Sequence, residues 1–519
     1  MSSVPPAKSA PDAPTVPSAI ADAYDPERFR REGHALIDEL ADALAAMHRR
    51  EGRVLSWRAP ADARDAWAAE GLGTIESRTS EVPDRLRTIE SRASEPSDGF
   101  RTTESRATEW EPETLAHDLS RVVAASTALH NPRYLGHQVA PALPSASLAE
   151  LVSALLNNGT GVYEMGPASV PIELAVIRWM CERAGYVDGG GAVTGGGTLT
   201  SGGSLGNLTA LLAMRQAKAG VWERGTERQL AVVTSSDSHY SVARAVRVMG
   251  WGDAGVITVP VDDQHELRAA AVEAALEKVG DDRVIGIVAA AGSTATGAFD
   301  PLDELADLAE RRGLWLHVDA AHGGGALLSA RHRGKLAGIA RADSIVWDAH
   351  KLMMMPALVT AVLFKRADDV YEAFAQQASY LFAGGAPRDT WWDLGQRTVE
   401  CTKRMMSIEL WAALRQHGER WFGEVVDRLF ELTAQFADLI AASGDFELAL
   451  RPEANIVCYR MRGADNRALR EACVRDGRFY IVGTQLDGSY WLRSTVMNPL
   501  TEPRDFIELL EHLRSLCRK

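Results

Sequence analysis

Cysteine is scarce in this chain. Its 519 residues include five cysteines, with no CxxC pair and no His/Cys cluster at metal-ligand spacing: Cys181, Cys401, Cys458, Cys473 and Cys517. This spacing argues against a zinc site, and a chain of this length does not need a disulfide framework to fold. We therefore expect no bound metal and thiols that are buried or incidental.

Long apolar runs and an excess of basic charge are also missing. No stretch approaches the roughly 20 apolar residues of a membrane span, and the first residues, Met1–Pro6, begin no apolar signal core. Acidic residues outnumber basic ones by 70 to 56, a formal net charge of -14, where a nucleic-acid-binding face would be basic. We expect a cytoplasmic protein without membrane or nucleic-acid partners.

The chain is too long for one hydrophobic core, and its composition changes along its length. Residues 1–25 are rich in Pro, Ala and Ser, which predicts a disordered leader, and 26–72 carry apolar residues at helical spacing. The segment 73–112 holds a polar repeat whose copies begin at Thr74, Thr88 and Thr102. Because the repeat has almost no core residues, it is typical of a solvated tether. A partner-binding role has no support in its residues.

From residue 113 to 404, short apolar runs alternate with helical patterns. We expect helices near 115–129, 148–156, 170–184, 206–219, 241–249, 265–279 and 302–311. The expected strands are Leu230–Thr234, Val256–Val259, Val284–Ala290, Leu314–Val318, Ser344–Trp347 and Thr360–Phe364. This alternation predicts an α/β fold with a mostly parallel sheet covered by helices on both faces. Residues 405–519 predict a smaller α+β domain.

Ligands on such sheets bind beyond the carboxyl ends of the strands, and two expected strands end in charged residues. Asp319 follows one of them; a cationic ring partner would offset the cost of burying its carboxylate, and a helix N-cap is the alternative. Lys351, just past another strand, is followed by the apolar run Leu352–Met355. An apolar surround would make this amine an imine-forming nucleophile, whereas the alternative is a lysine whose stem covers apolar surface.

Weaker signals lie at the other strand ends. The glycine-rich stretch Thr200–Asn207 opens a helix and suits an anion such as phosphate, although it matches neither the P-loop nor the GxGxxG pattern. A plain turn is the alternative. His239 follows one strand and could stack on a flat ring, and the Ser293 hydroxyl follows another. Each signal alone is ambiguous, but together they describe a site for a phosphorylated ring.

The chain resembles the pyridoxal-phosphate (PLP) group II amino-acid decarboxylases from about residue 115 onward. The motifs that carry the resemblance are Asn131–Tyr134, Thr200–Ser204, Ser236–Ser241, His317–His322, Asp348–Lys351 and Leu492–Pro499. The resemblance implies the aspartate-aminotransferase-like fold, called fold type I. That fold has a seven-stranded sheet, an N-terminal helical segment and a small C-terminal α+β domain.

The resemblance also implies a role for each matching residue. Lys351 would be the Schiff-base lysine with His350 as a cofactor contact, Asp319 would pair with the ring nitrogen, and Ala321 would pack under the ring. His239 would stack over the ring, and Gly203 and Ser204 would hold the phosphate. Arg493 would bind the substrate α-carboxylate, for which a guanidinium is well suited, and His137 lies in the segment expected on the substrate side.

Tyr380 resembles the family's mobile-loop tyrosine, which protonates the substrate carbon after CO2 leaves. Its presence favours decarboxylation to an amine over aldehyde-forming oxidation or carbon–carbon lyase chemistry on the same fold. The family also implies a homodimer with this loop supplied across the interface. A catalytically silent scaffold using the repeat segment is the non-enzyme alternative, against which the intact set of Lys351, Asp319, His239 and Tyr380 argues.

The substrate stays open between acidic, diamino and aromatic amino acids. Residues Leu135–Gln138 differ from the Phe-Asn-Gln of glutamate-type enzymes, which weakens glutamate as the substrate. Lys403 and Arg404 are compatible with an acidic substrate side chain or with ion pairs at a subunit interface, and the second reading is favoured.

Overall fold

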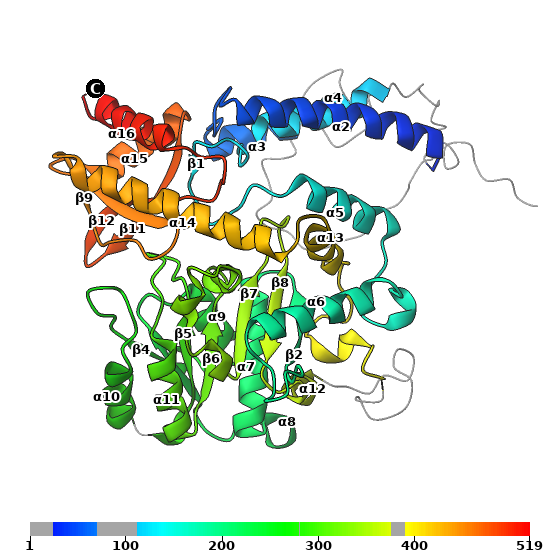
Figure 1. The fold of residues 1–519 in the computed structure, drawn as a ribbon, viewed down its shortest axis with the longest axis vertical. Helices are drawn as coiled ribbons and strands as arrows, with labels where there is room; N and C mark the ends of the chain where they lie inside the picture. The colour runs from blue at the N-terminus through cyan, green and yellow to red at the C-terminus, as the bar shows by residue number, and fades with distance from the viewer. Residues whose placement is uncertain (1–23, 70–111, 280, 375–389, 519) are drawn as a thin grey trace, which may run out of the picture. The chain divides into compact units, whose positions relative to one another are not determined.

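The computed structural model describes residues 24–69, 112–279, 281–374 and 390–518, in two compact units, 1–127 and 128–519 (Figure 1). The tandem repeat, most of the expected leader and Tyr380 lie outside the described residues. The described part of the first unit contains α2 (Pro26–His48), α3 (Pro60–Ala69) and α4 (Pro112–Ala125). Asp25 caps α2 by accepting hydrogen bonds from the backbone N–H groups of Glu27 and Arg28, both at 3.1 Å.

The second unit is built on a seven-stranded sheet. Its strands are β2 (Gly196–Thr200), β3 (Ala231–Ser235), β4 (Val256–Val259), β5 (Val284–Ala290), β6 (Trp315–Asp319), β7 (Ser344–Asp348) and β8 (Thr360–Phe364). They lie in the order β2-β8-β7-β6-β5-β3-β4, and only β8 runs antiparallel to its neighbours. The mostly parallel sheet is therefore confirmed, and the six predicted strands begin and end within one residue of their expected bounds.

The seventh strand, β2, was not predicted because its glycines are typical of a loop. The structure shows why glycine is needed there. A Cβ atom at Gly197 would lie 2.1 Å from the carbonyl oxygen of Val362 in β8. Close backbone approach thus replaces side-chain packing in this strand, and no apolar pattern marks it.

Alternate strand residues contribute to two separate hydrophobic clusters, one on each face of the sheet. Val232 and Val288 pack with α7 (Gly203–Ala219), α9 (Tyr240–Val248) and α12 (Asp368–Phe374). Val233 and Ile287 pack with the helices of the opposite face, α6 (Ser169–Arg183), α10 (Ala269–Val279) and α11 (Leu302–Arg312). Both faces are covered by helices, as predicted.

The C-terminal part begins with α13 (Ser407–His417) and α14 (Glu419–Ala442) and ends with α16 (Pro503–Cys517). Between them lie β9 (Phe446–Leu448), β10 (Ile456–Met461), α15 (Asn466–Asp476), β11 (Tyr480–Leu486) and β12 (Ser489–Thr495). The sheet order is β1-β11-β12-β10-β9, where β1 (Tyr134–Leu135) comes from far earlier in the chain and runs parallel to β11. Strand β1 was not predicted, because two residues carry no periodic signal.

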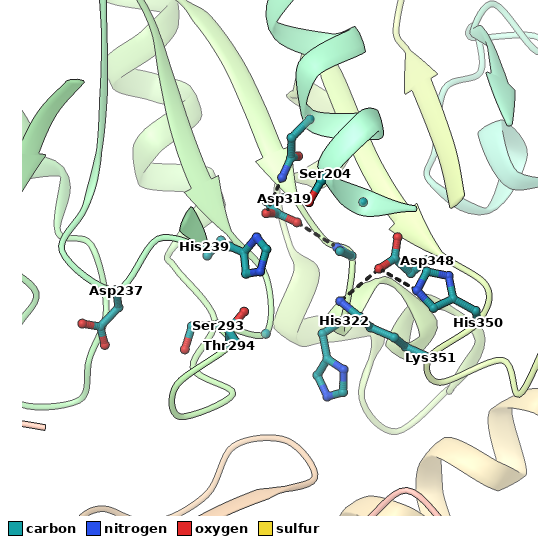
Figure 2. A pocket seen from close by; sticks show the side chains of 15 residues that line it. Ser204, Asp237, His239, Ser293, Thr294, Asp319, His322, Asp348, His350 and Lys351 are labelled. Atoms are coloured by element: carbon teal, nitrogen blue, oxygen red, sulfur yellow. Dashed lines mark hydrogen bonds and ion pairs between the residues drawn. The ribbon is translucent and has the colours of Figure 1, made fainter. Parts of the chain in front are cut away.

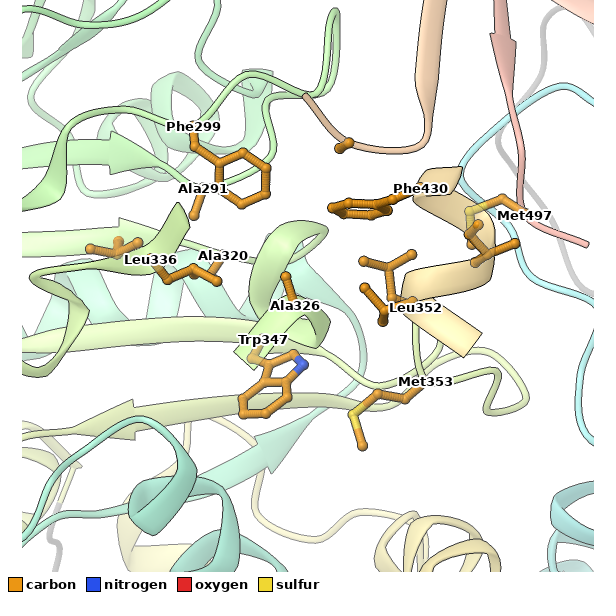
Figure 3. Packing of buried hydrophobic residues seen from close by; sticks show 14 of the residues in the cluster. Ala291, Phe299, Ala320, Ala326, Leu336, Trp347, Leu352, Met353, Phe430 and Met497 are labelled. Atoms are coloured by element: carbon orange, nitrogen blue, oxygen red, sulfur yellow. The ribbon is translucent and has the colours of Figure 1, made fainter. Parts of the chain in front are cut away.

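The C-terminal elements share a hydrophobic core with the large sheet. Figure 3 shows Phe430 of α14 beside Leu352, with Trp347 of β7 and Met353 in the same cluster. Residues 352–355, which follow Lys351, are at most 1% exposed. The backbone just after this lysine is therefore held in the core. Two further helices of the described residues are α5 (Pro144–Leu156) and the four-residue α8 (Val221–Arg224). Among the described residues, no helix is both long and apolar enough to cross a membrane.

Candidate active site

One cavity lies at the carboxyl ends of β3, β5, β6 and β7 and at the start of α7 (Figure 2). All the cofactor-contacting residues that the resemblance implies line it: Gly203, Ser204, His239, Ser293, Asp319, Ala321, His350 and Lys351. Parallel strands present their carboxyl ends at one edge of the sheet, so residues far apart in sequence meet there. The same wall includes Asn207, Asp237, Thr294, His322 and Asp348, which the sequence had not singled out as site residues.

Lys351 is held by a buried carboxylate. Its Nζ lies 2.9 Å from Oδ2 of Asp348, the last residue of β7, and Nε2 of His350 lies 3.5 Å from the same oxygen. Burial alone would raise the pKa of Asp348, but the charges of Lys351 and His350 outweigh it and lower that pKa. The Thr360 hydroxyl donates to the other carboxylate oxygen at 2.5 Å. The amine is thus positioned in the cavity wall and is only 19% exposed.

Asp319 ends β6 on the side of the sheet that faces α7. Its Oδ2 accepts a hydrogen bond from Nδ2 of Asn207 at 2.8 Å, and its Oδ1 accepts one from the backbone N–H of Ala321 at 3.2 Å. The short helix that follows begins after His322, so Asp319 does not cap it. The N-cap alternative is therefore wrong, and the carboxylate is oriented toward the cavity.

A chain of hydrogen bonds connects Asp319 through Asn207 to the buried side chains of His317 and Ser344. His317 is fully buried, and burial lowers its pKa to about 4, so its ring is neutral. Its Nε2 lies 3.0 Å from Oδ1 of Asn207, which only accepts, so Nε2 must carry the proton. The Ser344 hydroxyl therefore donates to Nδ1 of His317, at 2.9 Å, while it accepts from the indole N–H of Trp315. This chain fixes the orientation of the Asn207 amide.

Asn207 also orients His239. Its second amide N–H donates to the Ser241 hydroxyl at 2.9 Å, and that oxygen lies 2.7 Å from Nδ1 of His239. Burial lowers the pKa of His239, so its ring is neutral, with Nδ1 as the acceptor and the proton on Nε2. One amide thus orients both the carboxylate and the imidazole. Sequence spacing contained this signal: Asn207 lies one helical turn after Gly203, and His317 lies two residues before Asp319 on one strand face.

The start of α7 forms the other end of the cavity. Its N-cap residue, Gly202, has φ of 99° and provides no side-chain cap, so the first N–H groups of the helix are available to a ligand. A Cβ atom at Gly203 would lie 3.2 Å from the carboxylate of Asp348, a tight contact that would push this side chain. An uncapped helix N-terminus suits phosphate. Together with Asp319 and Lys351, it makes the cavity fit PLP.

Two predicted substrate residues lie beside the cavity and do not line it. Arg493 of β12 is buried; its Nε donates to the carbonyl of Ala295 at 3.1 Å and its Nη2 to that of Thr294 at 2.7 Å. His137 is exposed, and the pKa of its ring is lowered by the surrounding protein atoms and by the charges of Arg493 and Arg470. Arg493 and Arg470 therefore place positive charge around His137, and Arg493 also contacts the loop that contains Thr294.

Lys403 has neither of the roles considered from the sequence. It forms a buried ion pair with Glu173 of α6 within the same chain, and it donates to the Thr198 hydroxyl and the Leu199 carbonyl at 2.7 Å. Arg404 lies near the surface, 3.1 Å from Glu150. No group of three or more His, Cys, Asp or Glu side chains that could hold a metal occurs in the described part of the chain.

Comparison with known proteins extends these findings. Residues 101–462 match the family model described as the pyridoxal-dependent decarboxylase conserved domain. The chain is 32% identical to the acidic amino acid decarboxylase GADL1 of Mus musculus, over 76% of each protein. It is 30% identical to the cysteine sulfinic acid decarboxylase of Mus musculus, over 76% of this chain and 84% of that protein.

Solved structures show the same fold. The crystal structure of Oryza sativa TDC with PLP and tryptamine superimposes with a TM-score of 0.81, covering 95% of this chain and 98% of that one at 22% identity. At this identity the likeness concerns the fold alone.

Proposed function

This chain belongs to the pyridoxal-dependent decarboxylase family and is a PLP-dependent amino-acid decarboxylase, and from that premise we propose that its substrate is an acidic L-amino acid. The reaction is that of a carboxy-lyase, which releases CO2 and leaves the amine. When bound, PLP supplies an electron sink for the charge that CO2 loss leaves at Cα. The protein must then hold the substrate, keep the cofactor ring protonated and return a proton to Cα.

The positive charge of Arg493 and Arg470 supports an acidic substrate. Arg493 and Arg470 lie close enough to His137 for both charges to lower the pKa of its ring. Arg493 also donates to the carbonyl of Thr294, whose residue lines the cavity. A second carboxylate or sulfinate on the substrate would be attracted to these cations. The names of the two mouse relatives point to the same class of substrate.

The roles of the cavity residues follow from their contacts. Lys351 would hold the cofactor covalently, with Asp348 and His350 orienting its amine, and Asp319 would keep the ring nitrogen protonated. His239 would cover the ring as a neutral imidazole. The start of α7 at Gly203 would bind the phosphate. Arg493 would bind the substrate α-carboxylate if its two bonds to the loop carbonyls are exchanged for the ligand.

The substrate proposal is tested by measuring CO2 and amine release from a panel of amino acids. L-Aspartate, L-glutamate and L-cysteine sulfinate form the acidic set, and L-2,4-diaminobutyrate and L-tryptophan form the comparison set. We expect turnover of at least one acidic amino acid and little of the others. Turnover confined to the diamino or aromatic compounds would refute the acidic class. A colourless protein that takes up no PLP would favour the scaffold alternative.

Tyr380 lies outside the described residues, and its role as the proton donor to Cα is proposed from the sequence alone. The change Tyr380→Phe removes the hydroxyl and keeps the ring. We expect amine formation to fall sharply while dissolved O2 is consumed as the oxidant and aldehyde, ammonia and peroxide appear with the CO2, all measurable by product analysis. An unchanged ratio of amine to CO2 would exclude Tyr380 as the donor.

We also propose that the protein is a homodimer. Leu148, Leu151, Val152, Leu155 and Leu156 of α5 are each between 45% and 63% exposed, and their spacing places them on one helix face. A stripe of this kind marks an association surface, because monomers rarely expose contiguous apolar patches. A second copy of the chain is the proposed partner. Cytoplasmic residence stays a prediction from the sequence, which cell fractionation would test.

A further inference from the structure

The cavity contains an acid that the decarboxylation chemistry does not use. Asp237 follows β3 and lines the cavity, and its side chain is 17% exposed. In Figure 2 it lies at the outer edge of the site, on the far side of His239 from Lys351. An uncompensated carboxylate there would repel an acidic substrate, because charge interactions are strong where water is partly excluded.

His265 contacts this acid from a separate loop. Its Nδ1 lies 2.7 Å from Oδ2 of Asp237, and its Nε2 lies 3.8 Å from Oδ2 of Asp487, in the turn between β11 and β12. Asp262, on the histidine's own loop, adds a third negative charge nearby. Two carboxylates near one imidazole favour its doubly protonated cation, which donates to Asp237 and attracts Asp487 across 3.8 Å. The hydrogen bond to Asp237 and the nearby acids raise the pKa of His265 accordingly.

The backbone holds His265 in place at a conformational cost. Its φ is 63°, in the left-handed region that residues other than Gly adopt uncommonly, Asn, Asp and His most often among them, and the residue is 6% exposed. Asp262 fixes this turn: its carboxylate accepts from the backbone N–H groups of Gln264 and Glu266 at 3.0 and 2.9 Å. A buried, strained histidine directed at an acid of the cavity wall indicates a functional constraint.

We propose that His265, as a cation between Asp237 and Asp487, cancels the charge of the cavity acid Asp237 and thereby admits an acidic substrate side chain. This inference rests on the proposed substrate class. His265 is a specificity-determining residue that acts through Asp237 and does not itself touch the reacting atoms. Arg493 and Arg470 attract the acidic side chain of the substrate. Because His265 neutralises Asp237, this carboxylate no longer opposes that attraction.

The test compares holoenzyme variants in turnover of the acidic amino acid that the wild type uses. His265→Asn keeps a residue that tolerates the left-handed backbone and removes the charge. We expect KM to rise about tenfold, with kcat largely kept, since an unpaired charge now faces the substrate. The double variant Asp237→Asn/His265→Asn should return KM toward the wild-type value. Asp263→Asn is the control, because Asp263 is an exposed acid on the same loop as His265 and should change KM little.

The pH profile provides a readout that a structural role would not move. In the wild type, KM should rise as the pH increases through the raised pKa of His265, because the cation is lost. His265→Asn should show the high KM already at low pH. In the double variant Asp237→Asn/His265→Asn, KM should not rise with pH. A folded His265→Asn enzyme with unchanged KM, or a double variant without recovery, overturns the role of His265 alone. A wild type that turns over no acidic amino acid overturns the substrate class and this inference together.

Discussion

Asn207 determines the geometry of two cavity residues at once. Its amide bonds Asp319 at 2.8 Å and the Ser241 hydroxyl at 2.9 Å, and it accepts from His317. Each of these partners is buried or half-buried, so none can exchange its bond for water without cost. The carboxylate and the imidazole thus depend on an amide that itself need not touch the cofactor.

Replacing this amide tests that dependence. Asn207→Ala leaves the buried N–H of His317 without an acceptor and removes one bond from Asp319. We expect PLP affinity to weaken by about 1–3 kcal/mol, since that is the cost of leaving such groups unpaired. The measurement is an absorbance titration of the cofactor-free protein with PLP. Gln216→Ala, an exposed amide on the same helix, is the control. Equal affinities in both variants would contradict the positioning role of Asn207.

At the scale of elements, a buried ion pair joins a helix, a strand and the segment that precedes another helix. Lys403 and Glu173 have side chains only 1% exposed, and through Thr198 and Leu199 they connect α6, β2 and the segment before α13. Glu173 accepts the backbone N–H of Leu199 at 2.9 Å. The two glycines at the start of β2 have no side chains to pack, so this polar cluster adds to the attachment that Leu199 gives the strand.

Lys403→Met should therefore destabilise the fold strongly. The change leaves the Glu173 carboxylate buried without its cation, a loss of about 3–5 kcal/mol in unfolding free energy. Denaturant-induced unfolding measures it. Arg404→Met is the matched control, since Arg404 is 62% exposed and its pair with Glu150 is worth about 1 kcal/mol or less. A similar, small effect for both variants would show that the ion pair contributes no more than a surface one.

The apolar stripe on α5 makes a second prediction at this scale. Leu155→Asp places a charge on the most exposed leucine of the stripe, at 63%. We expect the dimer to dissociate, because a buried, unpaired carboxylate at an interface is costly. Light scattering after size-exclusion chromatography measures the mass. Val248→Asp on α9, where the residue is 67% exposed, should leave the mass unchanged. A wild-type enzyme that is already monomeric would refute the homodimer proposal.

Elements with a strong periodic signal were predictable from the sequence, and those without one were not. The β-branched runs of β5 and β7 have a clear strand signal, whereas β2 depends on glycines that pack against Val362 and β1 is two residues long. The cavity residues were found because parallel strands end at one edge. Asn207 and His317 were missed as site residues because their spacing from Gly203 and Asp319 becomes informative only once the helix and the strand are known to be neighbours.

On the scale of the whole second unit, residues of the C-terminal sheet support the wall of the cavity. Asn455, next to β10, accepts a hydrogen bond from Nε2 of His322 in the cavity wall at 2.6 Å. Arg493 of β12 holds the carbonyls of Thr294 and Ala295 on the loop after β5. The two sheets also share one hydrophobic cluster. Loss of packing in either sheet should therefore disturb the cavity, and the large and C-terminal parts are expected to unfold together.

Buried acids give this unit a distinct pH dependence. Burial raises the pKa of Glu409 on α13 to about 8, with a further rise from Glu150, and one of its oxygens has no hydrogen-bond partner among the described residues. Burial likewise raises the pKa of Asp300 to about 7. Between the unfolded and folded pKa values, the folded state holds more protons than the unfolded state. Stability is therefore greatest at the acidic end of this window and falls as the pH rises through it.

The change Glu409→Gln should reduce the loss of stability that accompanies rising pH. The neutral amide needs no proton to stay buried, so the variant should gain stability over the wild type between about pH 4.5 and pH 8, by up to about 1.4 kcal/mol for each pH unit. Melting temperatures measured across this range test it. The control is Glu431→Gln on α14, where the side chain is 57% exposed. Its melting temperature should depend on pH in the same way as that of the wild type. Parallel curves for Glu409→Gln as well would mean that Glu409 is ionised in the folded protein, with Arg404 supplying the compensating charge.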